Sequence, residues 1–126
     1  MATLPTKILI VDDEPNILVA LDFLLKKNNC TVEKANNGVE ALQKIADFLP
    51  KIVILDVMMP EMDGLEVARQ IRANSDWSYI RIVFLTAKGT QYDKMMGYKN
   101  GAETYITKPF DNQQFIDVIN ELIEFD

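Results

Sequence analysis

The sequence Ile8-Leu9-Ile10-Val11-Asp12-Asp13 places four aliphatic residues directly before two acids. A run with no polar residue to turn towards water is typical of a strand that is buried on both faces of a parallel sheet. Two further runs have the same form, because residues 52–55 precede Asp56 and residues 82–85 precede Thr86. We therefore expect three buried strands, each ending in a polar side chain.

Weaker patterns complete the set of elements. Residues 31–35 alternate apolar and polar side chains, as an edge strand does, and residues 104–107 form a last strand that leads into Lys108. Between the strands, apolar residues recur at helical spacing over residues 15–27, 38–48, 64–73, 90–99 and 112–124. A strand followed by a helix, five times over, predicts an α/β fold with a five-stranded parallel sheet flanked by five helices.

Length and composition limit the function. The 126 residues suit one domain, expected over 1–126 with its core at about 6–125, and 48% apolar with 25% charged residues is a globular composition. The absence of histidine excludes Ser-His-Asp and Cys-His catalysis as well as histidine-containing zinc sites, and one cysteine excludes an internal disulfide.

Charge and hydropathy limit the partners and the location. The net charge of −6 argues against direct binding of nucleic acid. The longest apolar run has five residues, Ile17 to Leu21, so no membrane insertion is expected. With no leader pattern at the start, we expect a cytoplasmic protein.

The polar residues that follow the strands predict a functional site. The carboxyl ends of parallel strands meet at one edge of the sheet, so Asp12, Asp13 and Asp56 converge if the first and third strands are neighbours. Each residue alone would be interpreted as a cap or turn residue, but their joint occurrence favours function. Three carboxylates need a cation, and oxygen ligands suit Mg²⁺. With Lys108 and Thr86 as donors to a bound anion, the set is suited to forming an aspartyl phosphate.

Five segments in this order resemble the receiver domain of bacterial two-component response regulators, of the CheY type. They are Ile8–Pro15 (ILIVDDEP), Asn37–Leu42 (NGVEAL), Val53–Gly64 (VILDVMMPEMDG), Ile82–Ala87 (IVFLTA) and Gly101–Phe110, which ends in Thr107-Lys108-Pro109-Phe110. The resemblance implies the strand order 2-1-3-4-5.

The resemblance also implies a role for each site residue. Asp56 is the phosphoacceptor, and Lys108 pairs with the phosphoryl oxygens. Asp13 binds Mg²⁺ directly and Asp12 helps through water, while Asp56 and the main-chain carbonyl of Met58 complete the protein ligands.

Two further residues are implied to act as the switch. Thr86 bonds the phosphoryl group, and Tyr105 follows it between an exposed and a buried rotamer. The Lys108–Pro109 peptide bond is expected to be cis.

The implied function is a phospho-accepting switch rather than an enzyme with external turnover, since only Asp56 itself is phosphorylated and dephosphorylated. The donor is a histidine kinase, a histidine phosphotransfer protein or a small phosphodonor. Phosphorylation changes the surface of the fourth helix, fifth strand and fifth helix, which binds a downstream effector protein of unknown identity.

Three alternatives remain open. A metal-dependent phosphatase with an aspartyl nucleophile normally has a second acid two residues on, where this chain has Met58. A flavin-binding electron carrier of the same topology needs a Ser/Thr/Gly-rich loop after the first strand, where residues 12–15 read Asp-Asp-Glu-Pro. A receiver that is not phosphorylated is disfavoured by the complete set of motif residues.

The last helix has an unusual charge. Residues 111–126 contain five acids and no lysine or arginine. Symmetric receiver dimers of the DNA-binding type use basic groups from this helix, so we expect no such dimer here.

Overall fold

A computed structural model gives the structure of the protein over residues 5–87 and 101–124. Its centre is one sheet of five parallel strands in the order β2-β1-β3-β4-β5, which confirms the expected fold class and strand order. The strands are β1 (Lys7–Val11), β2 (Thr31–Ala35), β3 (Ile52–Asp56), β4 (Arg81–Thr86) and β5 (Thr104–Thr107).

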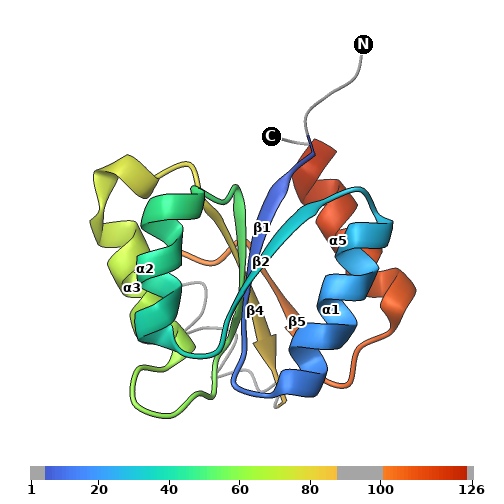
Figure 1. The fold of residues 1–126 in the computed structure, drawn as a ribbon, viewed down its shortest axis with the longest axis horizontal. Coiled ribbons are helices and arrows are strands. Elements are labelled where there is room, and N and C mark those ends of the chain that lie inside the picture. Colours follow the sequence, from blue (N-terminus) through green and yellow to red (C-terminus); the bar gives the residue numbers. More distant parts are fainter. Residues whose placement is uncertain (1–4, 88–100, 125–126) are drawn as a thin grey trace.

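Helices cover both faces of the sheet, with α1 and α5 on one side and α2 and α3 on the other (Figure 1). They are α1 (Pro15–Lys27), α2 (Gly38–Phe48), α3 (Gly64–Ala73) and α5 (Asn112–Glu124), with a short 3-10 helix, η1 (Ser75–Trp77), before β4. The described residues thus hold four of the five expected α-helices, and the one expected over residues 90–99 lies outside them.

The buried strands divide their side chains between two cores. In β1, Leu9 and Val11 pack in the cluster with α2 and α3, whereas Ile8 and Ile10 pack in the cluster with α1 and α5. All four side chains are fully buried. This explains the unbroken apolar run, because alternate residues of a strand face opposite sides of the sheet and both sides are covered here.

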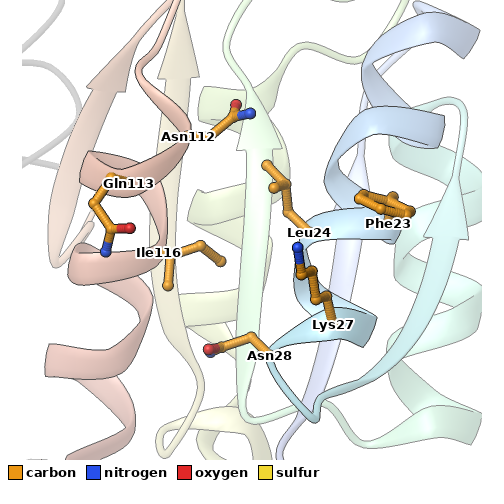
Figure 2. A pocket seen from close by; sticks show the side chains of 7 residues that line it. All are labelled: Phe23, Leu24, Lys27, Asn28, Asn112, Gln113 and Ile116. Atoms are coloured by element: carbon orange, nitrogen blue, oxygen red, sulfur yellow. The ribbon is translucent and has the colours of Figure 1, made fainter.

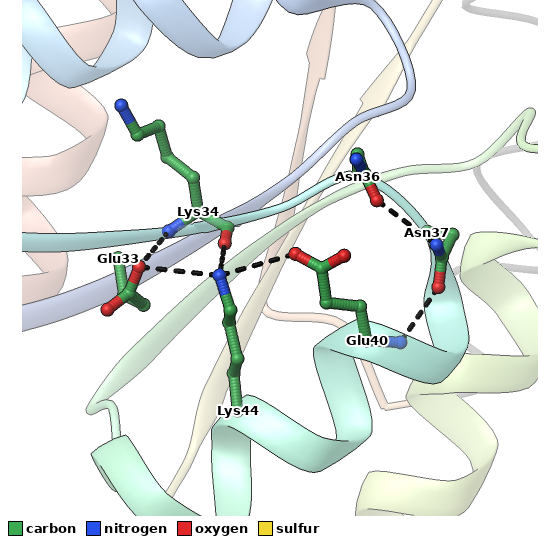
Figure 3. Close-up of polar contacts among 6 residues, drawn as sticks. All are labelled: Glu33, Lys34, Asn36, Asn37, Glu40 and Lys44. Atoms are coloured by element: carbon green, nitrogen blue, oxygen red, sulfur yellow. Dashed lines mark hydrogen bonds and ion pairs between the residues drawn. The ribbon is translucent and has the colours of Figure 1, made fainter.

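Polar side chains fix where the helices begin. The side chain of Asn37 accepts a hydrogen bond from the main-chain N–H of Glu40 at 2.8 Å, and Asp63 accepts one from Glu66 at 2.9 Å. These two side chains are the N-caps of α2 and α3. The side chain of Glu40 forms an ion pair with Lys44, one turn further along α2, at 3.2 Å (Figure 3).

Candidate functional site

The candidate site lies where four strands end. Val11 of β1 is in register with Leu55 of β3, so Asp12 and Asp56 follow side by side. Thr86 ends β4 on the other side of β3, and Lys108 follows β5. This edge of the sheet is where open α/β proteins place their functional crevice.

The ammonium group of Lys108 contacts three acids of the site. Its Nζ lies 2.9 Å from Oδ2 of Asp12, 3.4 Å from Oδ2 of Asp56 and 3.4 Å from Oε1 of Glu14. Asp12 is fully buried and Asp56 is 3% exposed, so both carboxylates depend on protein partners rather than on water. The single ammonium group thus faces three acids.

The carboxylates are close enough to share a cation. Asp12, Asp13 and Asp56 each offer an oxygen, and these oxygens lie within 4.8 Å of one another. Three carboxylate oxygens are hard donors of the kind that Mg²⁺ takes, and Asp13 is exposed, which leaves a path from solvent. The residues present therefore fit the expected divalent cation.

Main-chain donors orient two of these acids. The N–H of Met58 donates to Oδ1 of Asp56 at 3.1 Å, and the N–H of Glu14 donates to Oδ1 of Asp12 at 2.9 Å. These bonds fix one oxygen of each carboxylate, while the other faces Lys108. Met58 itself is 69% exposed, and its expected role as a carbonyl ligand stays a prediction.

Burial controls the protonation of Asp56. Its pKa is raised to about 6, first because burial disfavours the charged carboxylate and second because Asp12 repels it, while Lys108 opposes both effects. The pKa of Lys108 is also raised: burial would lower it, but the hydrogen bond that Lys108 donates to Asp12 and the charges of the surrounding acids outweigh that effect. A carboxyl group with this pKa is the sort of perturbed group that marks functional sites.

The two expected switch residues lie on the neighbouring strands. Thr86 is buried, and its main-chain carbonyl accepts a hydrogen bond from the N–H of Lys108 at 2.7 Å. Tyr105 packs against Phe84 with ring centroids 5.9 Å apart. The Lys108–Pro109 bond is cis, as predicted. The roles of Thr86 and Tyr105 in switching stay predictions.

Two residues at the site gained no role of their own from the sequence. Glu14 contacts Lys108, although only its place beside Asp12 and Asp13 hinted at that. Gly64 begins α3 so close to β3 that a Cβ there would lie 2.3 Å from the main-chain oxygen of Asp56. The requirement for glycine at this position is therefore steric.

A separate hollow of about 460 Å³ lies between α1 and α5. Figure 2 shows Phe23, Leu24 and Lys27 on one side and Gln113 and Ile116 on the other. None of its lining residues is an acid, so it offers no counterpart to the carboxylate cluster at the strand ends.

No helix within the described parts of the chain has the length and apolar character needed to cross a membrane.

Comparisons with known proteins agree with this geometry. The family model of the response regulator receiver domain matches residues 8–120. PhoP of Bacillus subtilis (strain 168), an alkaline phosphatase synthesis transcriptional regulatory protein, is 42% identical over 104 residues. That match covers 82% of this chain but only 42% of PhoP, so this chain spans less than half the length of that relative.

Solved structures of response regulators and receiver domains share the fold of this chain. A putative response regulator from Chloroflexus aurantiacus J-10-fl has a TM-score of 0.90 and 32% identity, covering 95% of this chain and 98% of its own. The chemotaxis protein CheY4 of Vibrio cholerae gives 0.89 and 30%, covering 94% and 98%. The receiver domain of a signal transduction histidine kinase from Syntrophus aciditrophicus gives 0.87 and 30%, covering 94% and 90%.

The family model matches nearly the whole chain, and the solved receivers share its fold. The cluster of Asp12, Asp13 and Asp56 fits this assignment. The chain belongs to the response regulator receiver domain family and is a CheY-like receiver of two-component signalling.

Proposed function

We propose that this receiver accepts a phosphoryl group on Asp56 from a phosphohistidine of a partner kinase or phosphotransfer protein, or from a small phosphodonor. The observation that carries the proposal is the buried Asp56 carboxylate, which lies 3.4 Å from Lys108 Nζ and beside two more acids. A carboxylate oxygen of Asp56 attacks phosphorus, the bond from phosphorus to the histidine nitrogen breaks, and that nitrogen leaves with the electron pair.

The residues of this chain divide the remaining work. Asp12, Asp13 and Asp56 would hold Mg²⁺, which supplies positive charge to offset the phosphoryl oxygens. Lys108 supplies a second cation, because its Nζ already lies within 3.4 Å of Asp56. Met58 N–H keeps Oδ1 of Asp56 in place. Asp56 is then regenerated by water, with no turnover of external substrates.

The signal leaves the site through Thr86 and Tyr105. Thr86 is buried at the end of β4, next to β3, and Tyr105 lies in the neighbouring strand. We propose that they rearrange when Asp56 carries a phosphoryl group and thereby alter the surface around β5 and α5 that a downstream effector binds. The relative PhoP is, by its name, a transcriptional regulatory protein. For the chain described here we propose contact with a protein effector, in the cytoplasm, and no direct contact with nucleic acid.

Phosphorylation by acetyl phosphate tests the proposal. The chain with Mg²⁺ should gain the mass of one phosphoryl group, and Asp56→Asn should gain none. Asp47→Asn on the exposed side of α2 removes the same charge far from the site and should behave as the parent chain. Label on Asp56→Asn, or equal labelling after chelation of the metal, would contradict the proposal.

The phosphatase alternative has its own test. Incubation with para-nitrophenyl phosphate and Mg²⁺ should release no more product than buffer does. Sustained turnover that Asp56→Asn abolishes would favour the phosphatase instead.

A further inference from the structure

Glu14 contacts the site but has no part in the proposed phosphoryl transfer. Its Oε1 accepts a hydrogen bond from Nζ of Lys108 at 3.4 Å, and its main-chain N–H donates to Oδ1 of Asp12 at 2.9 Å. The main chain of Glu14 is therefore held by one acid of the site, while its side chain contacts the cation. This double attachment ties the position of Glu14 to that of Lys108.

Helix capping would be the structural reason for a polar residue at this position. Glu14 is the N-cap residue of α1, yet its side chain makes no capping hydrogen bond. Asn37 and Asp63 do accept such a bond at the starts of α2 and α3, and Ser, Thr, Asp and Asn are the residues preferred there. The side chain of Glu14 thus gives the start of α1 no hydrogen bond and is directed to Lys108 instead.

The ammonium group of Lys108 contacts as many acids as it has N–H donors. It has three donors, and the carboxylates of Asp12, Glu14 and Asp56 lie 2.9, 3.4 and 3.4 Å from its Nζ. A phosphoryl group on Asp56 would bring three more acceptor oxygens and close to two negative charges to the same place. The phosphoryl oxygens must therefore compete with these acids for the ammonium.

The three acids differ in what it costs them to lose Lys108. The side chain of Asp12 is fully buried and makes the shortest contact, so its loss would leave a buried charge without a cation. The contact with Asp56 can pass to the phosphoryl group that Asp56 carries. The side chain of Glu14 is 60% exposed, so water can solvate its carboxylate after Lys108 has turned away. Glu14 is thus the acid that gives up the ammonium at the least cost.

We propose that Glu14 is a positioning residue that shares the ammonium of Lys108 in the unphosphorylated chain and releases it when Asp56 is phosphorylated. The inference rests on the proposed function and assigns a regulatory residue to the same site. Glu14 opposes phosphorylation, because the transfer must break its ion pair with Lys108 and bring negative charge towards its carboxylate.

Beryllofluoride, a mimic of the phosphoryl group, measures this competition. Its affinity for the full chain at saturating Mg²⁺, followed by fluorine NMR, should rise about threefold in Glu14→Gln, which keeps the length of the side chain and removes its charge. This size is expected because an exposed ion pair contributes less than one power of ten to an equilibrium constant. The rate of labelling by acetyl phosphate should rise by a similar factor.

Two further variants separate the contact with Lys108 from the mere presence of a charge. Glu14→Asp keeps the charge but is one methylene group shorter, which lengthens a contact that is already 3.4 Å. It should bind beryllofluoride more tightly than the parent chain, as Glu14→Gln does. Glu61→Gln is the matched control, because it removes an exposed acid from the loop after β3 that is not among the described contacts of Lys108. It should bind beryllofluoride as the parent chain does.

The side-chain carboxyl carbon of Glu14 reports the release directly. In the parent chain its carbon NMR signal should move when beryllofluoride binds. It should move towards its position in Lys108→Ala without the mimic, where no ammonium group is present. A Glu14 that served only the start of α1 would give the same signal in all three samples.

The outcomes separate the two proposals. If the parent chain takes up no phosphoryl group from acetyl phosphate, the proposed function fails. If labelling is normal but Glu14→Gln binds beryllofluoride no more tightly than the parent chain, the inference about Glu14 is wrong. An affinity of Glu14→Asp equal to that of the parent, an equal gain in Glu61→Gln, or a Glu14 signal that does not move on binding also overturns it.

Discussion

Asp56 and Glu66 are ten residues apart in sequence, and their pKa values are shifted in opposite directions. Glu66, on the outer side of α3, accepts two hydrogen bonds from Arg69 at 2.8 and 2.6 Å and one from Gln70, and its pKa is lowered to about 2. Asp56 also faces a cation, Lys108 at 3.4 Å, yet its pKa is raised to about 6.

Burial explains the difference. At the surface, water solvates both partners, so the hydrogen bonds from Arg69 and Gln70 outweigh the desolvation of Glu66 and favour its charged form. In the pocket, burial and the nearby Asp12 disfavour the charged form of Asp56 more than Lys108 favours it. The best ion-pair geometry thus belongs to the surface pair, whereas the pocket keeps a carboxylate whose burial Lys108 offsets only in part.

The largest expected effect on stability comes from disturbing the close contact between Gly64 of α3 and the main chain of Asp56. Gly64→Ala would place a Cβ 2.3 Å from the main-chain oxygen of Asp56, so β3 and α3 must separate. We expect a loss of about 3 kcal/mol in the free energy of unfolding, in the upper range for overpacking. Urea unfolding measures the loss, and labelling by acetyl phosphate should fall with it.

Gln43→Ala on the exposed side of α2 is the control, since it adds no atom near β3. An unaltered unfolding curve for Gly64→Ala would show that the contact between α3 and Asp56 is looser than described.

The next effect is a pH dependence of the free energy of unfolding, which we expect from Asp56. The folded-state pKa of Asp56 lies above its ordinary value of 3.8, so the folded chain keeps a proton that the unfolded chain has lost. In the absence of Mg²⁺, stability should therefore fall as pH rises from about 4 to about 6, by up to about 3 kcal/mol. Asp56→Asn lacks this loss and should be the more stable protein above pH 6.

Urea unfolding in EDTA across this pH range measures the difference between the two proteins. Asp47→Asn should keep the pH dependence of the parent chain. A constant difference between parent and Asp56→Asn at every pH would show that Asp56 is not the group responsible.

The smallest effect is expected at the surface pair. Glu66→Gln should change the midpoint of urea unfolding less than Gly64→Ala or Asp56→Asn does, because an exposed ion pair contributes little to the free energy of unfolding. The carboxyl signal of Glu66 should titrate near pH 2 in the parent chain and move towards its ordinary value of 4.5 in Arg69→Ala. An NMR titration checks this, and a midpoint that ignores Arg69 would show that the contact does not persist in solution.

The sequence predicted the elements well because each carries a local signal. Three continuous apolar runs are typical of buried strands, and Asn37 and Asp63 stand directly before two of the segments with helical spacing, whose first turns they cap. Strand order lacked such a signal, because an apolar run does not say which strand lies beside it. The order came from the family resemblance, and the register of β1 with β3 then brought Asp12 next to Asp56.

Contacts between distant side chains were beyond the sequence. Lys44 could pair with Glu40 one turn away or with Glu33 across the chain, and it contacts both. Similarly, Arg72 of α3 donates two hydrogen bonds to the main-chain oxygen of Gly101, 29 residues on, which no periodicity indicates. Such contacts depend on how helices settle on the sheet, and that is decided by packing.

The site brings together residues from early and late parts of the sequence. Lys108 and Asp12, which are 2.9 Å apart, are separated by 96 residues of sequence. During synthesis, the acids that follow β1 and β3 emerge long before the lysine that follows β5. Contacts of such separation form late in folding because a long loop must close first. A growing chain therefore carries the acids of the site before it carries Lys108, and the site is complete only after β5 and the residues that follow it have been made.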